Sequence, residues 1–231
     1  MPDVGRLPQP PGITSFYLVL TREGPAVPTQ NAPPVPPAGL LVARGATPEQ
    51  IAALEDRSHA HAIMHEGPLD QALGVERRAL AEAHDHALAH DGVVIDAIVP
   101  RVLELPITIS DRIRASDWFV FEHTESVVST HGMSRFGLPE LRTSAERQMP
   151  MYDAVLVGVA QRLLVEWPER DPIGPATITM RDIAHGYGDA SAGGGDPTLE
   201  RSVDVTLRHD AAADALEVVL HDDPAEALFA G

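Results

Sequence analysis

The hydrophobic pattern changes its period twice within Ser58–Ile95, and this alternation limits the folds open to the chain. Ser58–Glu66 alternates residue types with a period of two, which is typical of a β-strand. Across Val75–His90 the apolar residues follow helical spacing, and Asp91-Gly92 supplies a helix stop. Val93–Ile95 is a short apolar run, typical of a buried strand. This order predicts an α/β arrangement, with a right-handed crossover if the two strands are parallel.

Similar segments occur on either side. Thr47 has the residue type of a helix N-cap, and Pro48 and Gln50 follow at the positions that favour a helix through about Glu55. Apolar residues at helical spacing predict a second long helix at Met151–Glu166. Aromatic and β-branched runs predict further strands at Ser15–Thr21, Gly39–Ala43, Trp118–His123, Val127–Thr130, Thr177–Met180, Ser202–Arg208 and Leu216–His221.

We therefore expect residues 1–231 to form a single mixed α/β domain, with an α+β fold as the alternative. Its sheet should be mixed and carry a few packed helices, and its last two strands should form an antiparallel C-terminal hairpin. Two loops should interrupt it. Residues 23–39 are rich in proline, which lacks an N–H donor, and residues 188–197 are rich in glycine.

The composition excludes several kinds of chemistry. The 17 basic residues are all arginine, and the chain contains neither lysine nor cysteine. A Schiff base and a P-loop both need a lysine, whereas thiol nucleophiles, disulfides and cysteine-based zinc sites need cysteine. The net charge of −17 repels phosphate backbones, so nucleic-acid binding is not expected, and a basic protein partner would be attracted.

The sequence predicts a cytoplasmic protein. No stretch approaches the ~18–20 continuous apolar residues that a membrane span requires, so we expect no membrane partner. Met1–Thr14 contains several prolines and lacks the apolar core of a secretion signal.

Histidines provide the candidate metal ligands. The spacing H-x-H-x-x-x-H occurs at His59–His65 and again at His84–His90. His59 and His61 project from one face of the expected strand, and His86 and His90 lie one turn apart on the expected helix. Either pair could supply two ligands to zinc or another divalent metal. No HExxH signature accompanies them, so the simpler interpretation is that they are surface and packing residues and that no cofactor is bound.

The segment Thr130–Leu141, THGMSRFGLPEL, resembles a Gly-Met/Leu-x-x-Phe-Gly-x-Pro-Glu-Leu box of bacterial domain-of-unknown-function families. Such families are found near secretion and toxin systems, and the resemblance implies an accessory or immunity-type role. Physically, the glycines allow tight turns, and Phe136 can anchor the loop in a core. The alternative is that His131, Arg135 and Phe136 form one wall of a ligand or partner site.

These observations favour a non-catalytic, acidic binding protein of the bacterial cytoplasm that engages a protein partner. The alternative is a metal-dependent enzyme that uses a histidine cluster.

Overall fold

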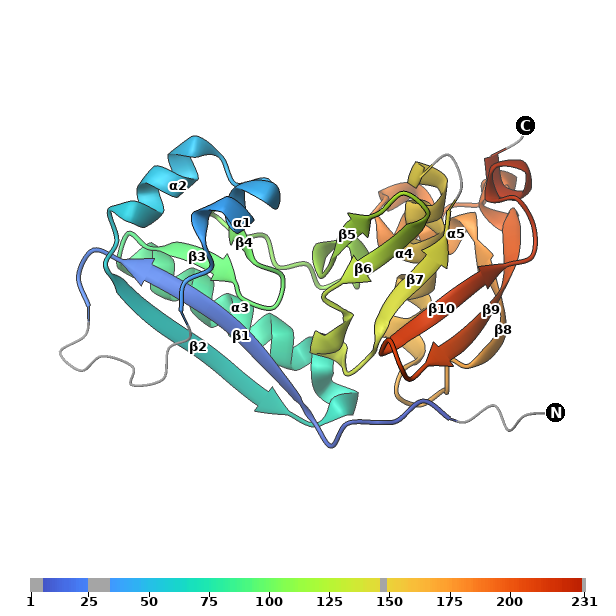
Figure 1. Ribbon diagram of the computed structural model, residues 1–231, viewed down its shortest axis with the longest axis horizontal. Helices are drawn as coiled ribbons and strands as arrows, with labels where there is room; N and C mark the ends of the chain where they lie inside the picture. The colour runs from blue at the N-terminus through green and yellow to red at the C-terminus, as the bar shows by residue number, and fades with distance from the viewer. Residues whose placement is uncertain (1–5, 25–33, 146–148, 230–231) are drawn as a thin grey trace. The chain divides into compact units, whose positions relative to one another are not determined.

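A computed structural model describes residues 6–24, 34–145 and 149–229 (Figure 1). Contacts between Cα atoms divide the chain into two compact units. The N-terminal unit is Gly12–Ile109, and the C-terminal unit is Ser110–Gly231 together with the segment that ends at Pro11. Each unit has its own sheet. The α/β class is confirmed, but the strands that we assigned to one sheet in one domain form two separate sheets.

The sheet of the N-terminal unit has the order β2-β1-β3-β4, and its neighbouring strands are antiparallel. Its elements are β1 (Ile13–Thr21), α1 (Ala38–Ala43), α2 (Pro48–Glu55), β2 (His59–Gly67), α3 (Ala72–Ala89), β3 (Val93–Asp96) and β4 (Arg101–Leu103). The predicted strand, helix and strand are confirmed as β2, α3 and β3. These two strands are parallel to each other, with β1 inserted between them.

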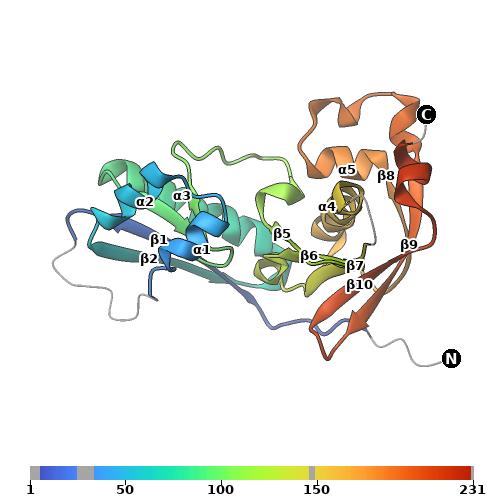
Figure 2. The ribbon, with the colours of Figure 1, turned by 45° about the horizontal axis from the view of Figure 1, so that its top comes forward.

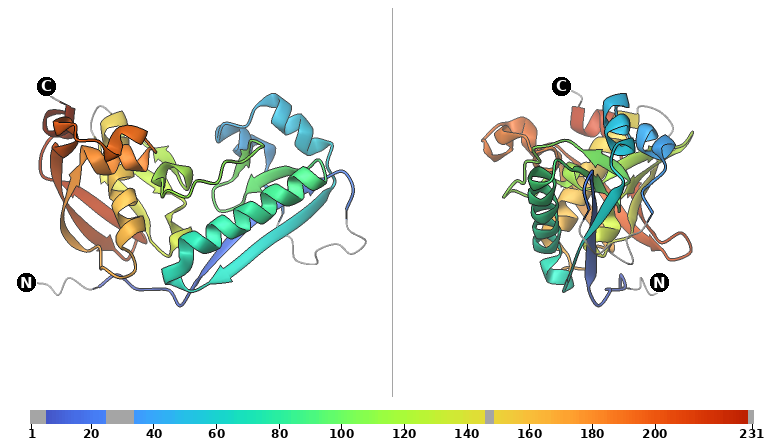
Figure 3. Two further views of the ribbon diagram at one scale, coloured as in Figure 1. Left: turned by 180° about the vertical axis from the view of Figure 1, so that it is seen from behind. Right: turned by 90° about the vertical axis from the view of Figure 1, so that its left-hand side faces the viewer.

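Helices cover both faces of this sheet. α3 runs along β1 and β2 (Figure 3) and buries its alanine-rich stripe, including Ala79 and Ala83. Leu41 of α1 and Leu54 of α2 pack with Ile95 of β3 in a separate core cluster. Helix α3 therefore covers one face of the sheet, and α1 and α2 cover the other. This explains why β1 is apolar on both faces.

The structure corrects the prediction of a strand at Gly39–Ala43, which belongs to helix α1. Pro37 occupies the N-cap position, and alanine and leucine favour a helix after it. A short apolar run fits either structure by its period alone. Of the predicted proline-rich loop 23–39, residues 25–33 lie outside the described residues, and the helix begins at Ala38.

The sheet of the C-terminal unit has the order β5-β6-β7-β10-β9-β8, and only the β7–β10 pair among these neighbours is parallel. Its strands are β5 (Val120–His123), β6 (Val127–His131), β7 (Glu140–Ser144), β8 (Gly174–Thr179), β9 (Ser202–Asp210) and β10 (Ala215–Leu220). α4 (Met149–Glu166) packs against β6, β7 and β8, and α5 (Met180–Gly186) packs against α4 (Figure 2). The mixed sheet and the antiparallel β9–β10 hairpin are confirmed. The glycine-rich segment 188–197 contains the 3-10 turn Ala190–Gly193.

Gly92 provides a test of how closely α3 and β1 approach. A Cβ atom there would lie 2.9 Å from Val19 Cγ1, 3.1 Å from Ala87 Cα and 3.2 Å from the Leu20 carbonyl oxygen. Because two of these contacts are backbone, we expect Gly92→Ala to destabilise the N-terminal unit by about 2 kcal/mol. Gly39→Ala is the control, since nothing lies within 4 Å of its Cβ position and alanine favours α1. Amide hydrogen exchange in β1 and β3 measures the stability of both variants. Equal protection in Gly92→Ala and Gly39→Ala would contradict this close packing.

Candidate functional site

The sheet of the C-terminal unit opens between its two parallel strands. β7 and β10 pair only from Ala215↔Glu140 to Glu217↔Arg142. Beyond that point β7 continues along β6 as far as Ser144, and β10 continues along β9 as far as Leu220. The Thr143 hydroxyl donates to the Val218 carbonyl at 2.8 Å, so a side chain bridges the strands where they begin to separate.

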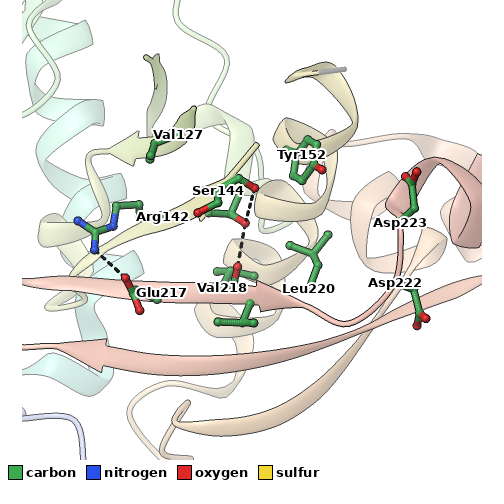
Figure 4. A pocket seen from close by; sticks show the side chains of 11 residues that line it. Val127, Arg142, Ser144, Tyr152, Glu217, Val218, Leu220, Asp222 and Asp223 are labelled. Atoms are coloured by element: carbon green, nitrogen blue, oxygen red, sulfur yellow. Dashed lines mark hydrogen bonds and ion pairs between the residues drawn. The ribbon is translucent and has the colours of Figure 1, made fainter. Parts of the chain in front are cut away.

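A pocket of about 560 Å³ occupies this opening (Figure 4). Its walls come from the carboxyl ends of both strands and from Tyr152 in the first turns of α4. Carboxyl ends of neighbouring parallel strands are where open α/β sheets usually bind ligands. The lining residues are Val127, Arg142, Thr143, Ser144, Tyr152, Glu217, Val218, Val219, Leu220, Asp222 and Asp223.

Arg142 is the basic residue of this lining, and neighbouring carboxylates already neutralise it. Its Nη2 atom lies 2.7 Å from Glu217 and 3.0 Å from Asp210. The hydrogen bond to Glu217 raises the pKa of Arg142 above its ordinary value, and Asp210 adds to this effect. Backbone N–H groups of Ala213 and Ala212 hold the pKa of Asp210 below its ordinary value, with a smaller contribution from Arg142. These ion pairs hold the Arg142 side chain in place and so fix this part of the pocket wall.

Asp222 and Asp223 bring additional negative charge to the pocket. Both are exposed. One oxygen of Asp223 accepts from the Ala225 N–H at 2.9 Å, next to the π-helical turn Ala225–Phe229. Within the described part of the chain, the Asp222 carboxylate forms no hydrogen bond or ion pair. The lining thus has more carboxylates than guanidinium groups, which suits a cationic ligand.

The histidine candidates are partly brought together in the N-terminal unit. The ring centroids of His61 and His86 are 4.3 Å apart, and those of His86 and His90 are 4.6 Å apart. Burial lowers the pKa of His86 below its ordinary value, and the neighbouring imidazoles lower it further. His59 does not join the cluster; its ring lies against Gly24, within 2.9 Å of the position a Gly24 Cβ would take.

Near this cluster, His65 Nε2 lies 2.7 Å from Glu82 Oε2, so β2 and α3 are also linked by an ion pair when the imidazole is protonated. Among residues 6–24, 34–145 and 149–229, no group of three or more metal-ligating side chains is arranged to hold a metal ion as the side chains stand.

The residues of the Thr130–Leu141 box occupy the connection between β6 and β7. Gly132 and Gly137 have φ values of 131° and 67°, which other residues rarely adopt. Phe136 is 2% exposed and packs edge-on against Trp118, with ring centroids 5.9 Å apart. Arg135 is 1% exposed, and its Nε donates to the Gly132 carbonyl at 3.3 Å. These contacts support the structural interpretation of the box. His131 is half-buried on β6.

Sequence reasoning missed the pocket residues. Asp222 and Asp223 follow a correctly predicted strand, so their place at its carboxyl end was the available signal. Their neighbour in space, Tyr152, lies 70 residues earlier in the sequence, and only the β7–β10 pairing brings the two segments together.

Comparison of the chain with protein-family models, curated proteins and solved structures finds no match. Among the helices that the structure describes, none combines the length and the hydropathy needed to cross a bilayer.

Proposed function

We propose that this chain is a non-catalytic binding protein of the bacterial cytoplasm that holds a basic segment of a partner protein in the β7–β10 pocket. The observation that carries the proposal is the opening of the sheet beyond Glu217↔Arg142, which leaves a carboxylate-rich pocket at the ends of two parallel strands. The side chains of Asp222 and Asp223 point in opposite directions from the segment after β10 (Figure 4), so each would meet a different guanidinium or ammonium group of a basic segment.

The electrostatics of the whole chain support the same kind of partner. With a net charge of −17, long-range attraction would accelerate the approach of a basic surface, and salt would slow it. Long-range attraction does not determine where the partner binds. The pocket supplies a defined position for one or two of its basic side chains. Fast association and a defined binding position would both serve the accessory or immunity-type role that the resemblance of Thr130–Leu141 implies.

Peptide binding provides the test. A labelled arginine-rich peptide should bind the full chain by fluorescence anisotropy, whereas its glutamate-rich counterpart should not. Raising NaCl from about 50 mM to about 300 mM should weaken the binding, because exposed charges are screened. Asp222→Asn combined with Asp223→Asn should weaken it about tenfold, since two exposed ion pairs together contribute about 1.4 kcal/mol.

The matched control removes the same charge elsewhere on this unit. Asp111→Asn with Glu169→Gln alters two exposed carboxylates outside the pocket and should change the affinity little. If this control weakens binding as much as the pocket variant does, the pocket is not the binding site. If neither peptide binds at low salt, the proposal fails altogether.

A further inference from the structure

Three imidazoles from two elements form a contiguous group in the N-terminal unit. His61 projects from β2, while His86 and His90 lie one turn apart near the carboxyl end of α3. The His86 ring lies between the other two, at centroid distances of 4.3 and 4.6 Å. His61 lies 25 residues before His86 in the sequence, so the packing of β2 against α3 is what brings their rings together.

The hydrogen bonds of these rings are incomplete. Nε2 of His86 is buried and has no hydrogen-bond partner. In the part of the chain that the structure describes, no hydrogen bond joins the His61 or His90 ring to another group. A buried nitrogen without a partner costs about 1–3 kcal/mol, which is a reason for evolution to remove it unless a ligand satisfies it.

The group is also electrically suited to a cation. Glu82 lies on the same helix one turn before His86, and its carboxylate already contacts His65 at 2.7 Å. Such a carboxylate next to a metal-binding histidine group is a frequent companion of metal sites.

Two of the three ring separations, His61–His86 and His86–His90, are close to those of a three-histidine site. When imidazoles share one tetrahedral ion at a metal–nitrogen distance of about 2.0–2.1 Å, their ring centroids lie about 5 Å apart. The observed separations are shorter by less than an ångström. As the side chains stand, their nitrogens do not converge on one point. For their nitrogens and His86 Nε2 to share one ion, the exposed His90 ring and the half-buried His61 ring must rotate about their side-chain bonds.

We propose that His61, His86 and His90 together bind one divalent transition-metal ion, such as Zn²⁺ or Ni²⁺, that links strand β2 to helix α3. The site is independent of the β7–β10 pocket, and it resides in the other unit of the chain. Imidazole ligands favour zinc, nickel and copper over magnesium and calcium, so the alkaline-earth ions should not compete.

Titration calorimetry with Zn²⁺ alone tests the site in the full chain. We expect one ion per chain, and His90→Ala should weaken binding by on the order of 100-fold because a direct ligand is lost. His90 is exposed, so this variant should fold as the parent does. His59→Ala is the control, since His59 lies on the same strand but outside the cluster, and it should leave the affinity unchanged.

A second measurement keeps the test decisive if zinc binds at several surface histidines. Imidazole NMR signals of His61, His86 and His90 should shift together on adding one equivalent of Zn²⁺, while that of His185 in the other unit should not. Saturating Zn²⁺ should also increase hydrogen-exchange protection in β2 and α3, because a ligand that binds only the folded state stabilises it. Failure to bind Zn²⁺, binding that survives His90→Ala, or binding that requires His59 would each overturn the proposal.

Discussion

Replacing Glu140 with alanine should lower the free energy of unfolding of the C-terminal unit by about 3 kcal/mol. Its carboxylate accepts from the N–H groups of Gly132 and Met133, at 2.8 and 3.1 Å, and from the Thr130 hydroxyl at 2.8 Å. The Thr130 hydroxyl in turn accepts from the backbone N–H of Leu141. Alanine would leave the N–H groups of two buried residues without their partner.

Urea unfolding followed by tryptophan fluorescence measures this effect. Both tryptophans of the chain, Trp118 and Trp167, belong to the C-terminal unit, so the signal reports on that unit. Glu140→Gln keeps one acceptor oxygen and should lose only about 1 kcal/mol. Ser134→Ala, at an exposed position of the same box, should be neutral within about 0.5 kcal/mol. A stable Glu140→Ala variant would mean that the box is not held by this carboxylate.

This network explains why the box has its particular residues. Glycines make the two turns, Phe136 and Leu138 are each 2% exposed, and Glu140 satisfies the backbone of the loop that precedes it. Each of these roles is structural. The alternative in which Arg135 and Phe136 face a partner requires exposure that neither side chain has.

Elements that depend on local pattern were predictable from the sequence. Helix α2 begins with the expected capping box, in which Gln50 and Thr47 exchange hydrogen bonds, and α3 ends at the expected stop, where Asp91 has a φ of 48°. Strand β7 was missed although Leu141 and Thr143 are buried with a period of two. It is short and lies partly inside the Thr130–Leu141 box, so its alternation is brief.

Elements of the site that depend on long-range pairing were not predictable. The histidine spacing indicated one pair on the strand and one on the helix. It carries no information about which strand histidine, His61 or His59, contacts the helix pair. That choice depends on how β2 lies against α3. The pocket is a similar case, because it exists only where β7 and β10 separate, and local patterns carry no information about which strands become neighbours.

The largest effect should come from Leu216→Ala, which removes a side chain that is 0% exposed from the centre of the same sheet. Leu216 stands opposite Leu141 in the short parallel ladder, immediately before the strands separate. Loss of its side-chain carbons leaves a cavity between β10 and its neighbours, and leucine-to-alanine changes at such sites cost about 3–4 kcal/mol. Tryptophan fluorescence during urea unfolding measures the loss.

Leu220→Ala gives the matched comparison on the same strand. Leu220 lies beyond the point of separation, is half-buried and lines the pocket, so its removal should cost about 1 kcal/mol. The binding of the arginine-rich peptide should respond differently, because shortening Leu220 alters the pocket wall, whereas Leu216 faces the core. If Leu216 stabilises the β7–β10 pairing and Leu220 forms part of the pocket wall, Leu216→Ala should reduce stability more and Leu220→Ala should reduce affinity more. The reverse order for either measurement would contradict this division between the core and the pocket.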